Sequence, residues 1–117
     1  TSQIRSGKIK AYGVTTKTRV PSLKEIPTLE EQGLKGFEVA VWHGLYAPKG
    51  TPKPVQDKLV AALQSAVQDA TFKARLAELG AEPVPVSKAN PESLRNHLKA
   101  EVEKWGPIIK KAGVYAD

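Results

Sequence analysis

The chain has 117 residues, a formal net charge of +6 and no cysteine. This length suits one modest domain, and the lack of cysteine excludes a disulfide scaffold, thiol catalysis and a cysteine-ligated metal site. Lysine and arginine are spread through every segment, and the longest basic run is Lys110-Lys111. A basic nucleic-acid-binding module needs its charge clustered on one face beside exposed aromatics. The even spread favours a solvated basic surface and leaves that module as the alternative.

The first predicted element is a strand over Lys8–Val14, where lysine alternates with apolar residues before the run becomes apolar. A polar loop follows and contains Thr15, Thr16, Thr18 and Arg19. Ligands of α/β proteins gather at the carboxyl ends of strands. Hydroxyl and guanidinium groups can donate hydrogen bonds to a carboxylate without adding negative charge. This loop is therefore a candidate anion-binding segment, and the alternative is a solvated loop of turn-favouring residues.

Thr28 and Glu31 fit a capping box, which predicts a helix of little more than one turn that ends at Gly33. After this turn, apolar residues alternate with small or polar ones, and the pattern predicts a strand over roughly Phe37–Ala47. Gly44 inside that strand indicates a bulge, a bend or a close backbone approach.

Trp42 and His43 are adjacent in the second predicted strand, so their side chains are expected on opposite faces. Trp42 either fills the core or stacks on a ligand. His43 either has a structural role or lies near a ligand. A small hydrolase that uses His43 remains a third possibility, although the chain has no nucleophile-elbow motif.

Residues Gly44–Leu59 read as a strand, a sharp turn and a helix start, which is the basic unit of an α/β domain. Thr51 is predicted to cap the helix with its hydroxyl, and Pro52 to occupy the first helical position. The helix is predicted to run to about Asp69. Its buried face, from the 3.6-residue spacing, comprises Val55, Leu59, Ala62, Leu63, Ala66 and Val67.

A second helix is predicted over about Thr71–Leu79, with Phe72, Leu76 and Leu79 pointing inward. Gly80 is expected to end it.

Glu82–Val86 is predicted to be extended. Its two prolines remove two ladder donors, so we expect an edge strand or an ordered connector. Asn90 then caps a long helix that has Pro91 at its first position. Pro107 falls within the apolar stripe of that helix and is expected to kink it or to end and restart it. Gly113 closes the element.

Neither the histidines nor the carboxylates have metal-ligand spacing, and no phosphate-binding loop is present. The sequence therefore predicts no metal and no cofactor.

An ordered set of short segments resembles one known family, the tripartite tricarboxylate transporter receptors, also described as TctC or Bug extracytoplasmic solute-binding proteins. The resemblance is to the carboxy-terminal part of these receptors and covers essentially the whole chain. The segments that carry it are Gly7-Lys8-Ile9-Lys10-Ala11, Val14-Thr15, Arg19, Pro27-Thr28-Leu29-Glu30-Glu31-Gln32-Gly33, Gly36-Phe37-Glu38, Trp42-His43-Gly44-Leu45-Tyr46-Ala47-Pro48-Lys49-Gly50-Thr51-Pro52 and Leu76-Ala77-Glu78-Leu79-Gly80-Ala81-Glu82-Pro83.

The resemblance implies an α/β fold that forms the carboxy-terminal part of a two-lobed type II periplasmic binding protein. It implies that residues 1–28 end the second lobe and start the return crossover. Residues 29–117 would then form the crossover and the carboxy-terminal half of the first lobe. Members of the family trap small organic anions, often carboxylates, in the cleft between the lobes and deliver them to membrane permease subunits. They are periplasmic and are not enzymes, and the resemblance implies no nucleic-acid partner.

The same resemblance places candidate ligand-binding residues in two segments. Thr15, Thr16 and Arg19 match the family's strand-end segment, and Trp42 and His43 match its crossover strand. The chain begins with threonine and contains no methionine, so we expect a processed chain or a piece of a larger protein. Apolar faces of such a piece would be covered by the amino-terminal part of the receptor or by a second copy.

Overall fold

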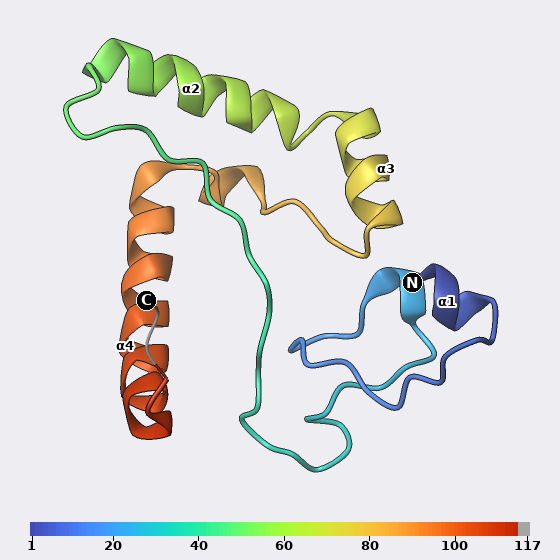
Figure 1. The fold of residues 1–117 in the computed structure, drawn as a ribbon. Helices are drawn as coiled ribbons and strands as arrows, with labels where there is room; N and C mark the ends of the chain where they lie inside the picture. Colours follow the sequence, from blue (N-terminus) through green and yellow to red (C-terminus); the bar gives the residue numbers. More distant parts are fainter. Residues whose placement is uncertain (115–117) are drawn as a thin grey trace. The chain divides into compact units, whose positions relative to one another are not determined.

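The structure is a computed structural model that describes residues 1–114 (Figure 1). Over that range it contains helices and irregular segments and no strand longer than an isolated bridge. The α-helices are α1 (Ser2–Arg5), α2 (Lys53–Ala66), α3 (Ala70–Glu78) and α4 (Pro91–Ala112), and two 3₁₀ turns, η1 (Pro21–Leu23) and η2 (Val86–Lys88), lie between them. Within the described range, no helix is both long enough and apolar enough to cross a membrane.

The chain divides into two compact units. The first unit combines Thr1–Leu45 with Gln68–Pro83 and so contains α1, η1 and α3. The second unit combines Tyr46–Val67 with the residues from Val84 onward and contains α2, η2 and α4. The expected assignment of residues 1–28 and 29–117 to different receptor lobes stays a prediction.

The buried centre of the first unit lies around η1. Leu23 and Ile26 are each 5% exposed, and the nearby Thr28 is 2% exposed. Arg5 of α1 donates from Nη2 to the carbonyl of Ser22 at 3.1 Å, which joins α1 to this cluster. The first unit therefore has a small buried centre, formed around η1.

The two predicted strands, Lys8–Val14 and Phe37–Ala47, are wrong as regular strands. In the described residues the first segment forms one parallel bridge, Val14 with Thr28. The Val39 N–H of the second donates to the carbonyl of Thr15, just beyond the first, at 2.9 Å. A strand exists only when a neighbouring segment completes its hydrogen-bond ladder. Alternation indicates which side chains share a face, but it does not supply that neighbour.

Helix α2 confirms the helix predicted from Pro52, but it begins one residue later, at Lys53. The Pro52 carbonyl accepts from the N–H groups of Val55 and Gln56 at 3.0 and 3.1 Å, so Pro52 is the residue that precedes the helix. The prediction that the Thr51 hydroxyl caps α2 is wrong, because that hydroxyl donates to the Pro48 carbonyl at 2.8 Å and closes the preceding turn. The helix ends at Ala66 rather than near Asp69.

The predicted buried face of α2 is only partly buried. Val67, just beyond the helix, is 5% exposed, whereas Val55 and Leu59 are 47% and 40% exposed. Gln64 of α2 donates from its side chain to the Ala89 carbonyl at 3.1 Å, so α2 is tied to the segment before α4 within the second unit.

Helix α3 matches the predicted range within a residue at each end. Its start is fixed by Asp69, whose carboxylate accepts from the Phe72 N–H at 2.8 Å. Gly80 follows with φ at 75°, a conformation that favours glycine. The prediction that Leu79 points inward is wrong, because Leu79 is 79% exposed.

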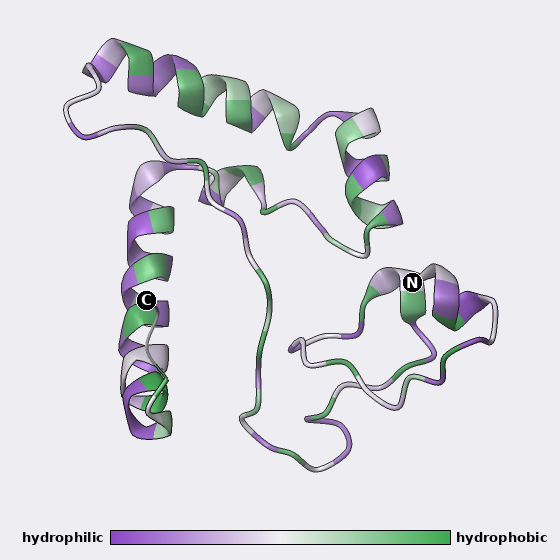
Figure 2. Ribbon diagram, in the orientation of Figure 1, coloured by the Kyte–Doolittle hydropathy of each residue, from purple (hydrophilic) through white to green (hydrophobic). Residues whose placement is uncertain are grey.

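Helix α4 begins as predicted. Asn90 accepts from the Ser93 N–H at 2.9 Å, and Pro91 occupies the first helical turn. The helix runs for 22 residues through Pro107, so of the two outcomes expected there an end and restart is wrong, and a kink stays a prediction. Hydrophobic and hydrophilic residues alternate around both α2 and α4 (Figure 2). Several apolar residues of α4 are exposed, including Val102 at 62% and Ile109 at 47%.

Candidate functional site

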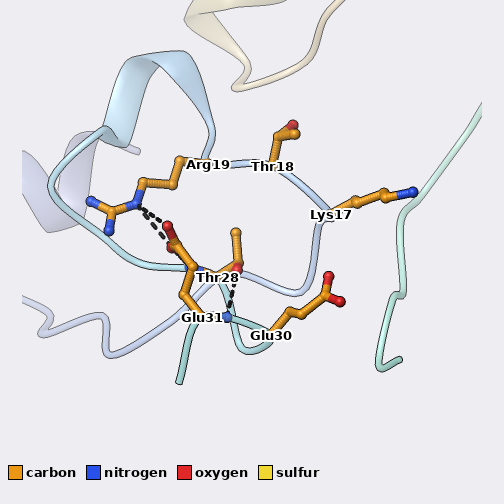
Figure 3. Close-up of a pocket in the computed structure, with 6 residues that line it drawn as sticks. All are labelled: Lys17, Thr18, Arg19, Thr28, Glu30 and Glu31. Atoms are coloured by element: carbon orange, nitrogen blue, oxygen red, sulfur yellow. Dashed lines mark hydrogen bonds and ion pairs between the residues drawn. The ribbon is translucent and has the colours of Figure 1, made fainter. Parts of the chain in front are cut away.

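An open hollow of about 370 Å³ lies in the first unit between the loop after Val14 and the turn that begins at Thr28 (Figure 3). Two cationic side chains, two carboxylates and two hydroxyls line it. These residues are Lys17, Thr18, Arg19, Thr28, Glu30 and Glu31.

The predicted capping box forms one wall of the hollow and is confirmed in both directions. The Thr28 hydroxyl accepts from the Glu31 N–H at 3.1 Å, and the Glu31 carboxylate accepts from the Thr28 N–H at 2.7 Å. The segment nevertheless remains a hydrogen-bonded turn and not a helix, which corrects the prediction. Gly33, with φ at 100°, turns the chain before a second helical turn can form.

Arg19 reaches across to the same carboxylate. Its Nε lies 2.9 and 3.1 Å from the two oxygens of Glu31, and its Nη1 donates to the Lys24 carbonyl at 2.9 Å. The hydrogen bond from Arg19 and then that from the Thr28 backbone lower the pKa of Glu31 below its ordinary value, against a smaller opposing effect of burial. Two donors, Arg19 Nε and the Thr28 N–H, therefore favour the charged form of Glu31.

Thr15 and Thr16, the other loop candidates, use their hydroxyls within the protein. Thr15 donates to the Val39 carbonyl at 2.7 Å, and Thr16 donates to the Thr18 carbonyl at 2.7 Å. These bonds fix the shape of the loop that carries Lys17 and Thr18 along the hollow. Lys17 extends away from the Arg19–Glu31 pair in Figure 3.

Of the five predicted site residues, the structure places Arg19 in the lining of the hollow, with Thr15 and Thr16 just before it in the same loop. Trp42 is half-buried and His43 is exposed, and neither is among the described residues that line the hollow. Their roles as ligand contacts stay predictions.

The sequence reasoning missed Lys17, Glu30 and Glu31 as members of a site. Glu31 carried a signal, because its place in a capping box fixes where its carboxylate lies. Glu31 pairs with Arg19, which lies twelve residues earlier in an irregular part of the chain. No local sequence pattern predicts such a pair. In the part of the chain that the structure describes, no group of three or more histidine, aspartate or glutamate side chains could hold a metal ion.

Residues 1–114 match the family described as the tripartite tricarboxylate transporter family receptor, and the chain belongs to this family. A UPF0065 protein from Agrobacterium vitis is 45% identical over 113 residues, covering 97% of this chain and 33% of the relative. Protein BugT from Bordetella pertussis is 28% identical over 110 residues, covering 94% of this chain and 33% of the relative.

Solved structures agree with this assignment. The periplasmic binding protein BugD is 53% identical and superposes with a TM-score of 0.84, covering 99% of this chain and 38% of BugD. MatC from Rhodopseudomonas palustris, solved with malate, is 37% identical with a TM-score of 0.78, covering 92% of this chain and 37% of MatC. The R. palustris protein Rpa4515, solved with adipate, is 32% identical with a TM-score of 0.79, covering 96% of this chain and 36% of Rpa4515.

The predicted family and fold class are therefore confirmed: the chain has the fold of a portion of a periplasmic binding protein. It spans about a third of the length of the curated relatives it matches. The family consists of receptors, and the structural neighbours are binding proteins.

Proposed function

We propose that this chain is part of a periplasmic receptor that captures a small organic carboxylate and presents it to the membrane permease of a tripartite tricarboxylate-type transporter. The observation that carries the proposal is the match of nearly the whole chain to binding proteins solved with malate and with adipate. Both of those ligands carry two carboxylate groups and no cationic group. A receptor of this kind binds and releases its ligand without chemical change, so the proposal assigns no catalytic residue.

The loop Thr15–Arg19 is the part of this chain that we propose for the anion site. It follows an extended segment, it borders an open hollow, and it carries Lys17 and the hydroxyl of Thr18 along that hollow, with Arg19 at its end. Ammonium and hydroxyl groups are suitable donors for a carboxylate. We propose Trp42 and His43 as further contacts from the following segment.

The anion site of the proposed receptor needs residues from a second lobe to enclose the ligand. Receptors of this type close two lobes around the ligand by a hinge motion. We propose that residues 1–28 belong to one lobe and residues 29–117 to the crossover and the other lobe. The parts of the relatives that this chain does not span would complete the cleft.

A thermal-shift panel tests the proposal on the protein as its gene encodes it. A ligand that binds only the folded state stabilises it by RT ln(1 + [L]/Kd), so the melting temperature rises with the logarithm of ligand concentration above Kd. We expect malate, adipate or another small carboxylate to raise the melting temperature, and the corresponding neutral diamides to leave it unchanged. Equal responses to acids and diamides, or no response to any organic anion, would refute the proposal.

A further inference from the structure

The carboxylate of Glu31 is the meeting point of the hollow's polar contacts. It accepts from Arg19 Nε at 2.9 and 3.1 Å and from the Thr28 N–H at 2.7 Å. Arg19 in turn holds the Lys24 carbonyl through Nη1 at 2.9 Å. The ion pair thus joins the loop that ends at Arg19 to the capping-box turn (Figure 3). The hydrogen bond from Arg19 to the Lys24 carbonyl adds the segment around Lys24.

The backbone connects the same two segments immediately beside this pair. The Val14 N–H donates to the Pro27 carbonyl at 3.0 Å, and the Leu29 N–H donates to the Val14 carbonyl at 3.0 Å. The bridge fixes the start of the loop, and the ion pair fixes its end. The residues between these two anchors, which include Lys17 and Thr18, are therefore tethered at both ends.

The pair is poorly suited to a role in stability alone. The side chains of Arg19 and Glu31 are 44% and 46% exposed, and exposed ion pairs contribute little to the free energy of unfolding. Nor is Arg19 well placed to neutralise an incoming anion, because a carboxylate already neutralises it. What the geometry does supply is a fixed position for the loop.

We infer that Arg19 and Glu31 form a positioning pair. The contact between them holds the loop Thr15–Arg19 in the arrangement that binds the ligand, and Arg19 does not itself contact the ligand. This inference rests on the proposed function. It makes a different prediction from direct contact, because the two models assign opposite roles to Glu31. For a positioning pair Glu31 supports binding, whereas for a ligand-contacting Arg19 it competes with the ligand.

The test is calorimetric titration of malate and adipate into the wild-type protein and into Arg19→Ala, Glu31→Gln and the double variant. Glutamine keeps the capping-box geometry and removes only the charge. A positioning pair predicts that each single change weakens affinity by about fivefold and that the double change weakens it no further, since residues of one network couple strongly. Tighter or unchanged binding by Glu31→Gln, or additive losses in the double variant, would overturn the inference.

The ion pair between Arg75 and Glu78 of α3, at 2.9 Å, is a matched control in the same unit. Arg75→Ala should leave affinity unchanged.

Amide chemical shifts of residues 15–19 give a readout that needs no ligand, and Glu31→Gln should move them whereas Arg75→Ala should not. If those shifts do not move, the positioning role is wrong. If they move but wild-type protein binds no carboxylate, it is the proposed function that fails.

Discussion

Val14 and Thr28 form a parallel bridge, and Thr28 is 2% exposed even though it lies in a turn. Its hydroxyl accepts from the Glu31 N–H at 3.1 Å. Thr28 therefore takes part in the one bridge of the described chain and also caps the turn. It lines the hollow and is itself part of the buried centre of the first unit.

Replacement of Thr28 with valine should destabilise the first unit. Valine keeps the shape of the side chain and leaves the Glu31 N–H without its acceptor, and loss of a cap costs about 1 kcal/mol. Urea unfolding followed by circular dichroism measures the change in the free energy of unfolding. Thr28→Ser, which keeps the hydroxyl, is the control and should lose clearly less. A Thr28→Val protein as stable as wild type would show that the cap contributes nothing.

Acid should weaken the protein through Glu31 by a small amount only, because its pair with Arg19 is exposed to solvent. The pKa of this carboxylate is lowered by the hydrogen bond from Arg19 and by that from the Thr28 backbone, so the unfolded chain takes up the proton more readily than the folded one. The stabilisation is present above the ordinary pKa of glutamate and is lost as pH falls through the lowered folded-state value.

Melting temperatures of wild type and Glu31→Gln across the acidic range measure this effect. The variant should lose part of the acid-dependent decrease, and the two proteins should converge at the lowest pH. Parallel profiles over the whole range would exclude Glu31 as a source of the pH dependence.

Asn90→Ala should shorten or loosen the start of α4. The Asn90 side chain accepts from the Ser93 N–H at 2.9 Å, and removal of such a cap costs about 1 kcal/mol. Asn96→Ala, on the exposed surface of the same helix, is the control and should change stability little. Chemical denaturation compares the two, and equal effects of both changes would contradict the capping role.

Pro107→Ala should stabilise α4. Pro107 lies inside the helix and is exposed, and proline in a helix interior is about 3 kcal/mol less favourable than alanine. The gain should appear as stronger helical circular dichroism and a higher unfolding midpoint. Pro91→Ala, at the first turn where the missing N–H has no intrahelical partner, should show no comparable gain. A loss of stability in Pro107→Ala would mean that the ring makes a contact worth more than the helix penalty.

Helices α2, α3 and α4 were predictable because their signals are local, whereas α1 and the two 3₁₀ turns were not predicted. Asn90, Pro91 and Gly113 bracket α4, and the 3.6-residue spacing of apolar residues marks α2, so a few neighbouring residues determine each element. Thr51 shows the limit of this reasoning, because its hydroxyl had two acceptable partners and bonds the turn before it instead of the helix after it.

Strands and the site were predictable only in part, because both depend on residues far apart in the chain. The alternation in Phe37–Ala47 identifies an extended segment, yet Val39 meets only Thr15. Arg19 was identified by its charge at the end of an extended segment, but its partner Glu31 was not, since nothing near Arg19 in the sequence points to a residue twelve positions away.

The central claim is that the protein binds a small organic carboxylate. Isothermal titration calorimetry of malate and of adipate into the protein as its gene encodes it tests this claim most directly. Our account predicts saturable binding with a stoichiometry of one for at least one small dicarboxylate, and no measurable heat of binding for the corresponding neutral diamide. Absence of binding across a panel of mono-, di- and tricarboxylates at millimolar concentration would contradict it.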